Sequence, residues 1–301
     1  MREPHNESLD RRLLLGVDAG GTGCRARVAD SRGRVLGEGH GPAANVLSDP
    51  AGAWSSIQQS IQVALGAAGA HDWPVGDAIA VLGLAGLDPA APEAPRDWPL
   101  ARFRACRIET DAYIAQRGAF AGADGAILIV GTGSVGLLVR GDERLSVGGY
   151  GAAVSDEGSG AWIGREAVRR ALWGFDGRLP RSLLTERILK AVGTPPAAQA
   201  WAKAARPADY AALTPAVFAA ADAGDGQAIK IIGEAVGHLG RILSRLADAG
   251  AKEVCLMGGL APTLRPWLRT GAIAIVEPQG TALDGALRLA SALARTVAPS
   301  S

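Results

Sequence analysis

Two short glycine-rich segments, 110 residues apart, are the strongest candidates for binding an anion such as phosphate. Residues 18–23 read Asp-Ala-Gly-Gly-Thr-Gly and residues 131–134 read Gly-Thr-Gly-Ser, and each segment follows or ends a short apolar run. Main-chain N–H groups in a tight turn after a strand can form an anion-binding nest, and the hydroxyls of Thr22 and Thr132 would add donors. Either segment alone could be an ordinary hairpin turn, but the matched pair favours a binding role.

Two aspartates could supply acid–base and metal chemistry beside these segments. Asp18 ends the first apolar run, where a carboxylate could hold Mg²⁺, through water, next to phosphate oxygens. Asp111 follows a short predicted strand and precedes a predicted helix, so it lies at the carboxyl edge of a sheet, where α/β proteins bind ligands. A carboxylate there could accept the proton of an attacking hydroxyl. The alternative for Asp111 is a helix N-cap.

A third polar region suits a ligand that carries several hydroxyl groups. Residues 148–151 read Gly-Gly-Tyr-Gly and residues 155–159 read Ser-Asp-Glu-Gly-Ser, so the backbone can approach a ligand closely and Asp156 can accept two hydroxyls. The alternative is a loop that ends in a helix N-cap. Asn45, in the segment Gly-Pro-Ala-Ala-Asn, is a weaker candidate.

Two familiar nucleotide motifs are excluded. Residues 131–136 match the pattern GxGxxG, but that motif requires a helix directly after it, and residues 135–139 continue as an apolar strand. A P-loop needs a lysine preceded by glycine, and none of the four lysines has one.

The candidate residues are positioned by a unit that occurs twice. Residues 13–17 predict a buried strand that enters the first glycine loop, and a second strand, a turn and a third strand follow. Residues 126–147 repeat this pattern, because setting Thr22 against Thr132 aligns the segments without a gap and places Val28 opposite Leu138. This internal duplication predicts two similar α/β domains that face each other, each with one glycine loop.

The remaining elements follow from apolar periodicity. A proline after Asp49 predicts a helix start, and later helices are predicted over residues 112–121, 160–173, 182–192, 208–221, 225–249 and 281–295. Further strands are predicted over residues 78–84, 107–110, 253–257 and 273–276.

Composition limits the classes of function. A net charge of +1 argues against a general nucleic-acid binder. No run of about 18 apolar residues predicts a membrane span, and the polar start, residues 1–12, does not resemble a signal peptide. Cys24, Cys106 and Cys255 are too far apart for a CxxC motif and are expected to be buried thiols of a cytoplasmic protein.

In combination and in this order, these segments resemble the N-acetylglucosamine kinase branch of the sugar kinase–actin–Hsp70 superfamily, grouped with the BadF/BadG ATPases. Residues 18–22 resemble its first phosphate motif and residues 131–134 its second. Residues 110–112 resemble the segment of the catalytic aspartate, and residues 258–259 the adenosine motif. The resemblance covers about residues 13–293.

The resemblance implies a fold class, a reaction and a set of site residues. The fold would be α/β, with duplicated ribonuclease H-like (actin-like ATPase) domains over residues 1–113 and 114–301 flanking a central cleft, the second domain carrying helical insertions. The chain would use ATP and Mg²⁺ to phosphorylate an amino sugar, N-acetylglucosamine first, at its 6-hydroxyl. Asp111 would be the base and Asp18 the metal ligand. The nucleotide would contact Asp18, Gly20, Gly21, Thr22, Gly131, Thr132, Gly133, Ser134, Gly258 and Gly259, and the sugar would contact Asn45, Gly149, Tyr150, Gly151 and Asp156.

Two departures from the family pattern concern the sugar side. Tyr150 stands where the family often has tryptophan, and Ser155 replaces a glycine before Asp156. The preference for an acetylated or a free amine therefore stays open, as do glucosamine and N-acetylmuramic acid as substrates. The sequence also leaves the oligomeric state open, with a homodimer as one assembly to test. A non-catalytic sugar sensor and a dehydratase activator are the competing classes, although the cysteine spacing does not suit the iron–sulfur cluster of such activators.

Overall fold

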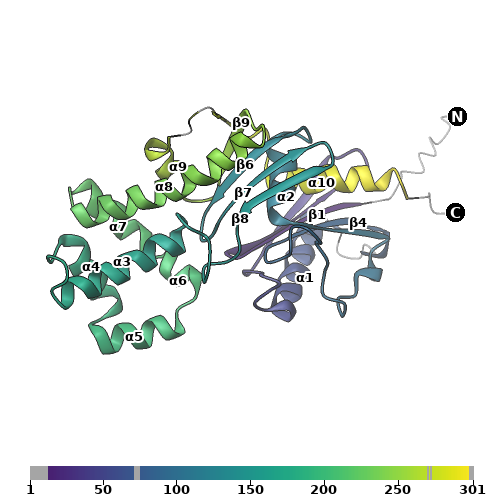
Figure 1. The fold of residues 1–301 in the computed structure, drawn as a ribbon. Helices are drawn as coiled ribbons and strands as arrows, with labels where there is room; N and C mark the ends of the chain where they lie inside the picture. Colours follow the sequence, from purple (N-terminus) through teal and green to yellow (C-terminus); the bar gives the residue numbers. More distant parts are fainter. Residues whose placement is uncertain (1–12, 71–74, 270, 272, 298–301) are drawn as a thin grey trace, which may run out of the picture. The chain divides into compact units, whose positions relative to one another are not determined.

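A computed structural model describes residues 13–70, 75–269, 271 and 273–297 (Figure 1). Residues 1–12, on which the expectation about a signal peptide rested, lie outside the described residues. The chain divides into two compact units, and we describe each by itself. Unit 1 comprises residues 1–123 and 278–301, and unit 2 comprises residues 124–277.

Unit 1 contains a five-stranded mixed sheet with the strand order β3-β2-β1-β4-β5. Its strands are β1 (Leu14–Gly20), β2 (Gly23–Ala29), β3 (Val35–Gly41), β4 (Ile79–Leu84) and β5 (Ala105–Thr110). The first three strands form an antiparallel meander, and β4 and β5 continue the sheet in parallel with β1. The carboxyl ends of β1, β4 and β5 therefore lie at one edge of the sheet.

Unit 2 repeats this topology strand for strand. Its sheet has the order β10-β9-β6-β7-β8, with β6 (Gly125–Val130), β7 (Ser134–Arg140), β8 (Glu143–Gly148), β9 (Glu253–Met257) and β10 (Ala274–Val276). Again three antiparallel strands are followed by two parallel ones. The duplication predicted from the glycine loops is thus present in the fold, and it extends to the two later strands.

The sheet of unit 1 is covered by helices on both faces. Leu15 and Val17 of β1 belong to the core cluster beneath α1 (Pro50–Ala67), whose N-cap is Asp49 as predicted. The intervening Gly16 points to the other face, because successive side chains of a strand alternate. A Cβ on Gly16 would lie 3.0 Å from Cβ of Ala286 in α10 (Ala282–Ala294), so glycine allows this helix to approach closely.

The last helix, α10, packs within unit 1, although the predicted domain boundary at 113/114 placed it with the C-terminal half. Gly285 of α10 and Gly118 of α2 (Asp111–Ala119) form a close helix crossing, since a Cβ on Gly285 would lie 1.9 Å from the carbonyl oxygen of Ile114. Arg27 of β2 also forms an ion pair with Asp284 of α10. These contacts join residues far apart in sequence, and helical periodicity alone does not reveal them.

A helical insertion separates β8 from β9 in unit 2. It consists of α3 (Gly160–Phe175), α4 (Leu183–Val192), α5 (Pro195–Ala204), α6 (Pro207–Ala211), α7 (Thr214–Asp222) and α8 (Gly226–Asp248). The helix predicted over residues 208–221 is divided into α6 and α7, because Pro215 lies in the first turn of α7 and cannot continue a preceding helix. The sequence analysis did not predict α5.

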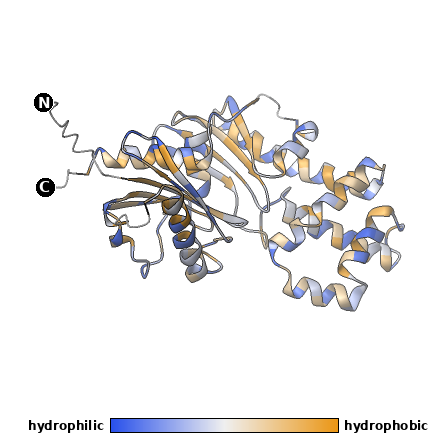
Figure 2. Cartoon of the chain, turned by 180° about the vertical axis from the view of Figure 1, so that it is seen from behind, coloured by the Kyte–Doolittle hydropathy of each residue, from blue (hydrophilic) through white to orange (hydrophobic). Residues whose placement is uncertain are grey.

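The long helix α8 joins two hydrophobic cores within unit 2. Its first half packs Ile231 and Ile232 among the helices of the insertion, and its second half packs Leu243 and Leu246 against the sheet. In Figure 2 the strands are coloured mainly hydrophobic, whereas the helices alternate hydrophobic and hydrophilic stretches. Such alternation is typical of helices with one buried face. None of the described helices is long and apolar enough to span a membrane.

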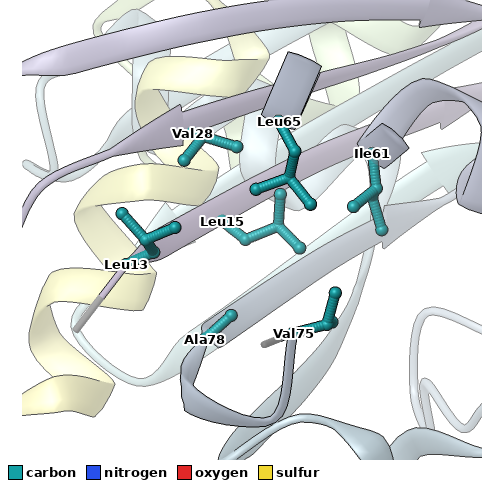
Figure 3. A pocket seen from close by; sticks show the side chains of 7 residues that line it. All are labelled: Leu13, Leu15, Val28, Ile61, Leu65, Val75 and Ala78. Carbon is teal, nitrogen blue, oxygen red and sulfur yellow. The ribbon is translucent and has the colours of Figure 1, made fainter. Parts of the chain in front are cut away.

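Four smaller helical pieces and two cavities are also present among the described residues. The chain also forms α9 (Ala261–Leu264), η1 (Val75–Asp77), η2 (Leu100–Arg102) and η3 (Arg265–Trp267). A cavity of about 10 Å³ lies in the core of unit 1 and is lined only by apolar side chains, including Leu15, Val28 and Leu65 (Figure 3). A neighbouring pocket of about 150 Å³ is lined by Trp54, Arg102 and other residues, none of which is a predicted site residue.

Candidate active site

Asp18 and Arg25 form an ion pair at the base of the first glycine loop. Strands β1 and β2 form a tight hairpin in which Gly20 pairs with Gly23 and Asp18 pairs with Arg25. The Arg25 guanidinium donates to the carboxylate of Asp18, which is 8% exposed. Burial raises the pKa of Asp18, and the positive charge of Arg25 opposes this shift. Asp18 is therefore a buried carboxylate that already has a cationic partner.

The tip of the first loop is open to a ligand. Gly21 and Thr22 are exposed, and a Cβ on Gly21 would meet no atom within 4 Å. The base of the loop is held by a hydrogen bond from the main-chain N–H of Ala44 to the carbonyl of Gly20, at 2.9 Å. An anchored base and an exposed tip are the arrangement required of a main-chain anion site.

Asp111 lies at the same sheet edge, directly after β5. The N-cap of α2 is Thr110, whose hydroxyl accepts from the N–H of Tyr113 at 3.1 Å, so the N-cap alternative for Asp111 is wrong. The carboxylate of Asp111 instead accepts from the N–H of Ala112 at 2.8 Å. Burial raises its pKa to about 6, and the nearby negative charge of Asp18 contributes to the same shift. Raised pKa values of this kind are common at catalytic sites.

Asn45 is tied to both the first loop and the end of β4. Its neighbours Ala44 and Val46 donate main-chain N–H groups to Gly20 and Ala85 respectively. Its Oδ1 atom accepts from the N–H groups of Leu47 and Ser48, at 3.0 and 3.1 Å. Because this oxygen is engaged in the turn, the Nδ2 group is the part of Asn45 suited to donate to a ligand.

The second glycine loop is anchored by α3. The main-chain N–H groups of Gly160 and Ala161 donate to the carbonyls of Gly131 and Thr132, at 2.8 and 3.1 Å. The hydroxyl of the buried Ser134 donates to the carbonyl of Glu157 at 2.9 Å. The loop is therefore connected to the start of the helical insertion and to the polar segment before it.

The polar segment 149–156 lies against this second loop. Gly149 and Gly151 have φ values of 79° and 94°, which glycine adopts readily, and the ring of Tyr150 is exposed. Asp156 is half-buried, and a Cβ on Gly133 would lie 2.8 Å from its Oδ2 atom. Burial raises the pKa of Asp156, while backbone hydrogen bonds from Ser134 and Gly151 lower it.

Gly258 and Gly259 follow β9 next to the end of β6. Gly258 has a φ of 92°, and a Cβ there would lie 2.4 Å from the carbonyl oxygen of Val130. The same carbonyl accepts from the N–H of Leu260 at 3.0 Å. The segment is therefore held beside the residue that precedes the second glycine loop, and only glycine fits its first position.

The structure thus gathers the predicted residues in two groups, one in each unit. In unit 1, Asp18, the first loop, Asn45 and Asp111 share the carboxyl edge of the sheet. In unit 2, the second loop lies beside the segment with Asp156 and beside Gly258. The sequence analysis missed Arg25 as the partner of Asp18. The hairpin register could have revealed it, because a turn centred on Gly21 and Thr22 places residues 18 and 25 opposite each other.

Comparisons with known proteins find relatives that match nearly the whole chain. A model of the BadF/BadG/BcrA/BcrD ATPase family matches residues 15–286. The glucosamine kinase GspK of Vibrio cholerae is 33% identical over 285 residues, covering 92% of this chain and 95% of that protein. A crystal structure from Chromobacterium violaceum, of a protein assigned as an N-acetylglucosamine kinase, is 33% identical with a TM-score of 0.83 and covers 93% of this chain and 99% of that one.

A more distant structure shows the fold alone. A ROK family glucokinase from Streptomyces griseus, in complex with glucose and AMPPNP, is 21% identical with a TM-score of 0.53 and covers 94% of this chain and 99% of that one. Together with the two sheets of identical strand order, these neighbours confirm the predicted fold class of duplicated ribonuclease H-like domains.

Proposed function

The chain belongs to the BadF/BadG/BcrA/BcrD ATPase family, and on that premise we propose that it is an ATP-dependent kinase that phosphorylates an amino sugar. The observation that carries the proposal is the juxtaposition of Asp111, with a pKa of about 6, and the buried Asp18 beside an exposed glycine loop. A poised base next to an anion site is what transfer of a phosphoryl group to an alcohol requires.

Asp111 acts as the general base in this proposal. Its carboxylate accepts the proton of the sugar 6-hydroxyl as that oxygen forms a bond to the γ-phosphorus of ATP. The bond between the γ-phosphorus and the bridging oxygen breaks, and ADP leaves with the electron pair. A pKa of about 6 makes Asp111 a stronger base than an ordinary aspartate while keeping it mostly ionised at neutral pH.

The two glycine loops hold the nucleotide in this proposal. Main-chain N–H groups of Gly20, Gly21 and Thr22, and of the second loop, bind the phosphate oxygens, as amide nests do. In residues 131–134 the N–H of Gly131 donates to the carbonyl of Gly133 at 2.9 Å, so the other three residues provide the second set of donors. Residues 258–259 lie against the adenosine. Binding through main-chain groups explains why a small side chain or none is present at most of these positions.

Asp18 is the residue that would hold Mg²⁺. No group of three or more His, Cys, Asp or Glu side chains that could hold a metal occurs among the described residues. Mg²⁺ bound beside phosphates commonly uses only one or two carboxylates and keeps several waters, and Asp18 already attracts the cationic side chain of Arg25. The donor set therefore fits Mg²⁺, which when bound would neutralise charge on the phosphate oxygens.

The sugar is proposed to bind Asn45 in unit 1 and Gly149, Tyr150, Gly151 and Asp156 in unit 2. N-acetylglucosamine is the first candidate, as expected from the sequence resemblance. Glucosamine is the second, because the relative from Vibrio cholerae that matches nearly the full chain is a glucosamine kinase. The acidic pair Asp156 and Glu157 would also favour a substrate with a positively charged amino group.

Compartment and assembly are further parts of the proposal. The three cysteines are free, and Cys24 and Cys255 are buried, which suits the reducing cytoplasm. A homodimer is the assembly we propose to test by sedimentation velocity.

A coupled assay with ATP and Mg²⁺ tests the proposed function. The sugars are glucosamine, N-acetylglucosamine, N-acetylmuramic acid and glucose, and ADP formation is measured for each. We expect one amino sugar to have the highest kcat/KM and glucose to be poor. Equal or absent turnover with all four sugars would contradict an amino sugar kinase, and sugar binding without turnover would favour a sensor.

A further inference from the structure

The second glycine loop is already in contact with a carboxylate of its own chain. A Cβ on Gly133 would lie 2.8 Å from Oδ2 and 3.2 Å from Cγ of Asp156. Backbone hydrogen bonds from Ser134 and Gly151 stabilise the charged form of the same carboxylate. Asp156 therefore contacts both the loop proposed to bind phosphate and the segment proposed to bind the sugar.

The backbone around Asp156 holds the carboxylate in this position. Asp156 has a φ of 60°, a left-handed conformation that is uncommon outside glycine. On one side the N–H of Ser155 donates to the carbonyl of Gly151 at 2.8 Å, and on the other the N–H of Ser159 donates to the carbonyl of Asp156 at 3.1 Å. The hydroxyl of Ser134 donates to the carbonyl of Glu157 at 2.9 Å. The contact is thus built by hydrogen bonds on both sides of the residue.

A carboxylate at this place competes with a phosphate group. Both are anions, and the carboxylate accepts from the N–H of Ser134, which is one of the main-chain donors proposed to bind phosphate. Like charges at short range in a half-buried setting repel each other appreciably. Glu157 adds a second negative charge, and Arg165, which donates to the carbonyl of Ala152 at 2.5 Å, partly offsets it. Phosphate binding to this loop is therefore disfavoured while the carboxylate keeps its N–H partners.

We propose that Asp156 is a positioning residue that couples the two ligands. Without sugar, its carboxylate accepts from the N–H of Ser134 in the second loop and weakens nucleotide binding. Sugar hydroxyls that donate to the carboxylate satisfy its charge and free the N–H of Ser134 for a phosphate oxygen. This inference rests on the proposed function, and it adds that sugar binding precedes tight binding of ATP and limits ATP hydrolysis by water.

Coupling of this kind is reciprocal and can be measured. If the sugar tightens nucleotide binding by some factor, the nucleotide must tighten sugar binding by the same factor. Isothermal titration calorimetry on the full chain would give the Kd of AMPPNP with Mg²⁺, alone and with saturating N-acetylglucosamine or glucosamine. We expect one of these sugars to tighten AMPPNP binding to the wild type by about fivefold or more, the usual lower range of such coupling.

The Asp156→Asn variant distinguishes a role of Asp156 in coupling the two ligands from a merely structural role. Asparagine tolerates a positive φ as well as aspartate does, and it removes the charge. We expect the variant to bind AMPPNP without sugar several-fold more tightly than the wild type, and the sugar to give little further gain. Loss of a merely structural contact would loosen the loop and weaken AMPPNP binding instead.

Glu157→Gln is the matched control, because it removes the same charge one residue away from the contact with Gly133. We expect this variant to keep most of the coupling between sugar and AMPPNP. Three results would overturn the inference: no coupling in the wild type, sugar-free AMPPNP binding in Asp156→Asn that is unchanged or weaker, or equal effects of the two variants. Absence of coupling in the wild type would overturn the inference even if a variant fails to fold. The affinity for AMPPNP without sugar does not depend on turnover, so failure of the sugar assay above would reject the proposed function separately.

Discussion

The two glycine loops occupy the same place in two copies of one topology, yet their surroundings differ. The first loop has an exposed tip, and its neighbours are the carboxylates of Asp18 and Asp111 and the cation of Arg25. The second loop has no acidic residue at its own strand end, and the carboxylate of Asp156 reaches it from a later segment. The repeat therefore supplies the hairpin scaffold. The surroundings of the two loops differ because of Asp18 and Arg25 within the first hairpin, Asp111 after β5, and Asp156 from a later segment.

The glycines near the ends of β4 and β9 also have different neighbours in the two units. Gly86 and Gly258 both have a positive φ, 87° and 92°, but Gly86 lies two residues after the end of β4 and Gly258 directly follows β9. A Cβ on Gly86 would lie 2.7 Å from Oδ1 of Asn45, a proposed sugar ligand. A Cβ on Gly258 would lie 2.4 Å from the carbonyl of Val130, next to the second loop. A left-handed glycine thus lies beside a proposed sugar ligand in unit 1 and beside the second loop in unit 2.

The largest expected effect is at Asp111, which directly follows β5 in unit 1. We expect Asp111→Asn to lower kcat by about 10²-fold or more, the scale of a positioned general base. Asp88→Asn is the control, because the exposed carboxylate of Asp88 accepts from the N–H of Ala90 in a loop. The kcat of this variant should stay near that of the wild type. A kcat of Asp111→Asn within a few-fold of the wild type would remove Asp111 from this role.

The pH dependence of turnover gives the next largest effect. Because the base must be ionised, the rate should fall about tenfold per pH unit below the pKa of Asp111, which is about 6. In the ligand-free protein, ¹³C NMR of the carboxyl groups should show Asp111 titrating near 6. Asp18→Asn should lower this pKa, because it removes a negative charge that raises it. A pKa of Asp111 near the ordinary value of 3.8 would contradict the described environment.

Substitution of Gly86 or Gly258 should have a smaller effect, on KM, that differs between the two units. We expect Gly86→Ala to raise KM for the sugar more than KM for ATP, because the methyl group presses on Asn45. Gly258→Ala should raise KM for ATP more than KM for the sugar. Each variant should also lose about 1–3 kcal/mol of stability, since alanine is strained at a φ near 90°. Steady-state kinetics and urea denaturation provide the measurements, and an identical KM pattern in both variants would contradict the division of roles.

The smallest expected effect is a gain in stability on losing the base. The folded-state pKa of Asp111 is raised from 3.8 to about 6, so the folded protein binds this proton more tightly than the unfolded chain. Its contribution to stability is therefore present below pH 3.8 and is lost as the pH rises through about 6. Asp111→Asn should stabilise the protein at pH 7 by up to about 3 kcal/mol, and the gain should vanish near pH 4. Thermal unfolding at both pH values would measure this difference, and equal stability of the two proteins at pH 7 would argue against the raised pKa.

Much of the fold was predictable because its signals are local. Apolar runs that end in glycine marked β1 and β6, and the gapless match of Thr22 with Thr132 marked the duplication. The place of α10 was not predictable, because it depends on Gly118 and Gly285 meeting across about 170 residues of sequence. A helical pattern shows which face is apolar but not which partner that face meets.

In the candidate site, too, local features were predictable from the sequence and tertiary contacts were not. The position of Asp111 at a sheet edge followed from a strand that precedes a helix, but its pKa depends on the nearby Asp18 and on burial, which only the fold supplies. The contact of Asp156 with Gly133 joins a hairpin to a later loop whose conformation includes a positive φ at a non-glycine residue. Sequence patterns do not predict such a conformation at an aspartate.

The central claim is that Asp111 and the first glycine loop act together to pass a phosphoryl group from ATP to an amino sugar. Quantitative ³¹P NMR of a reaction mixture with Mg²⁺, ATP and each amino sugar tests it most directly. We expect one sugar 6-phosphate for each ADP formed by the wild type, and almost no sugar phosphate with Asp111→Asn. ADP that accumulates with inorganic phosphate and no sugar phosphate, or equal product from both proteins, would contradict it.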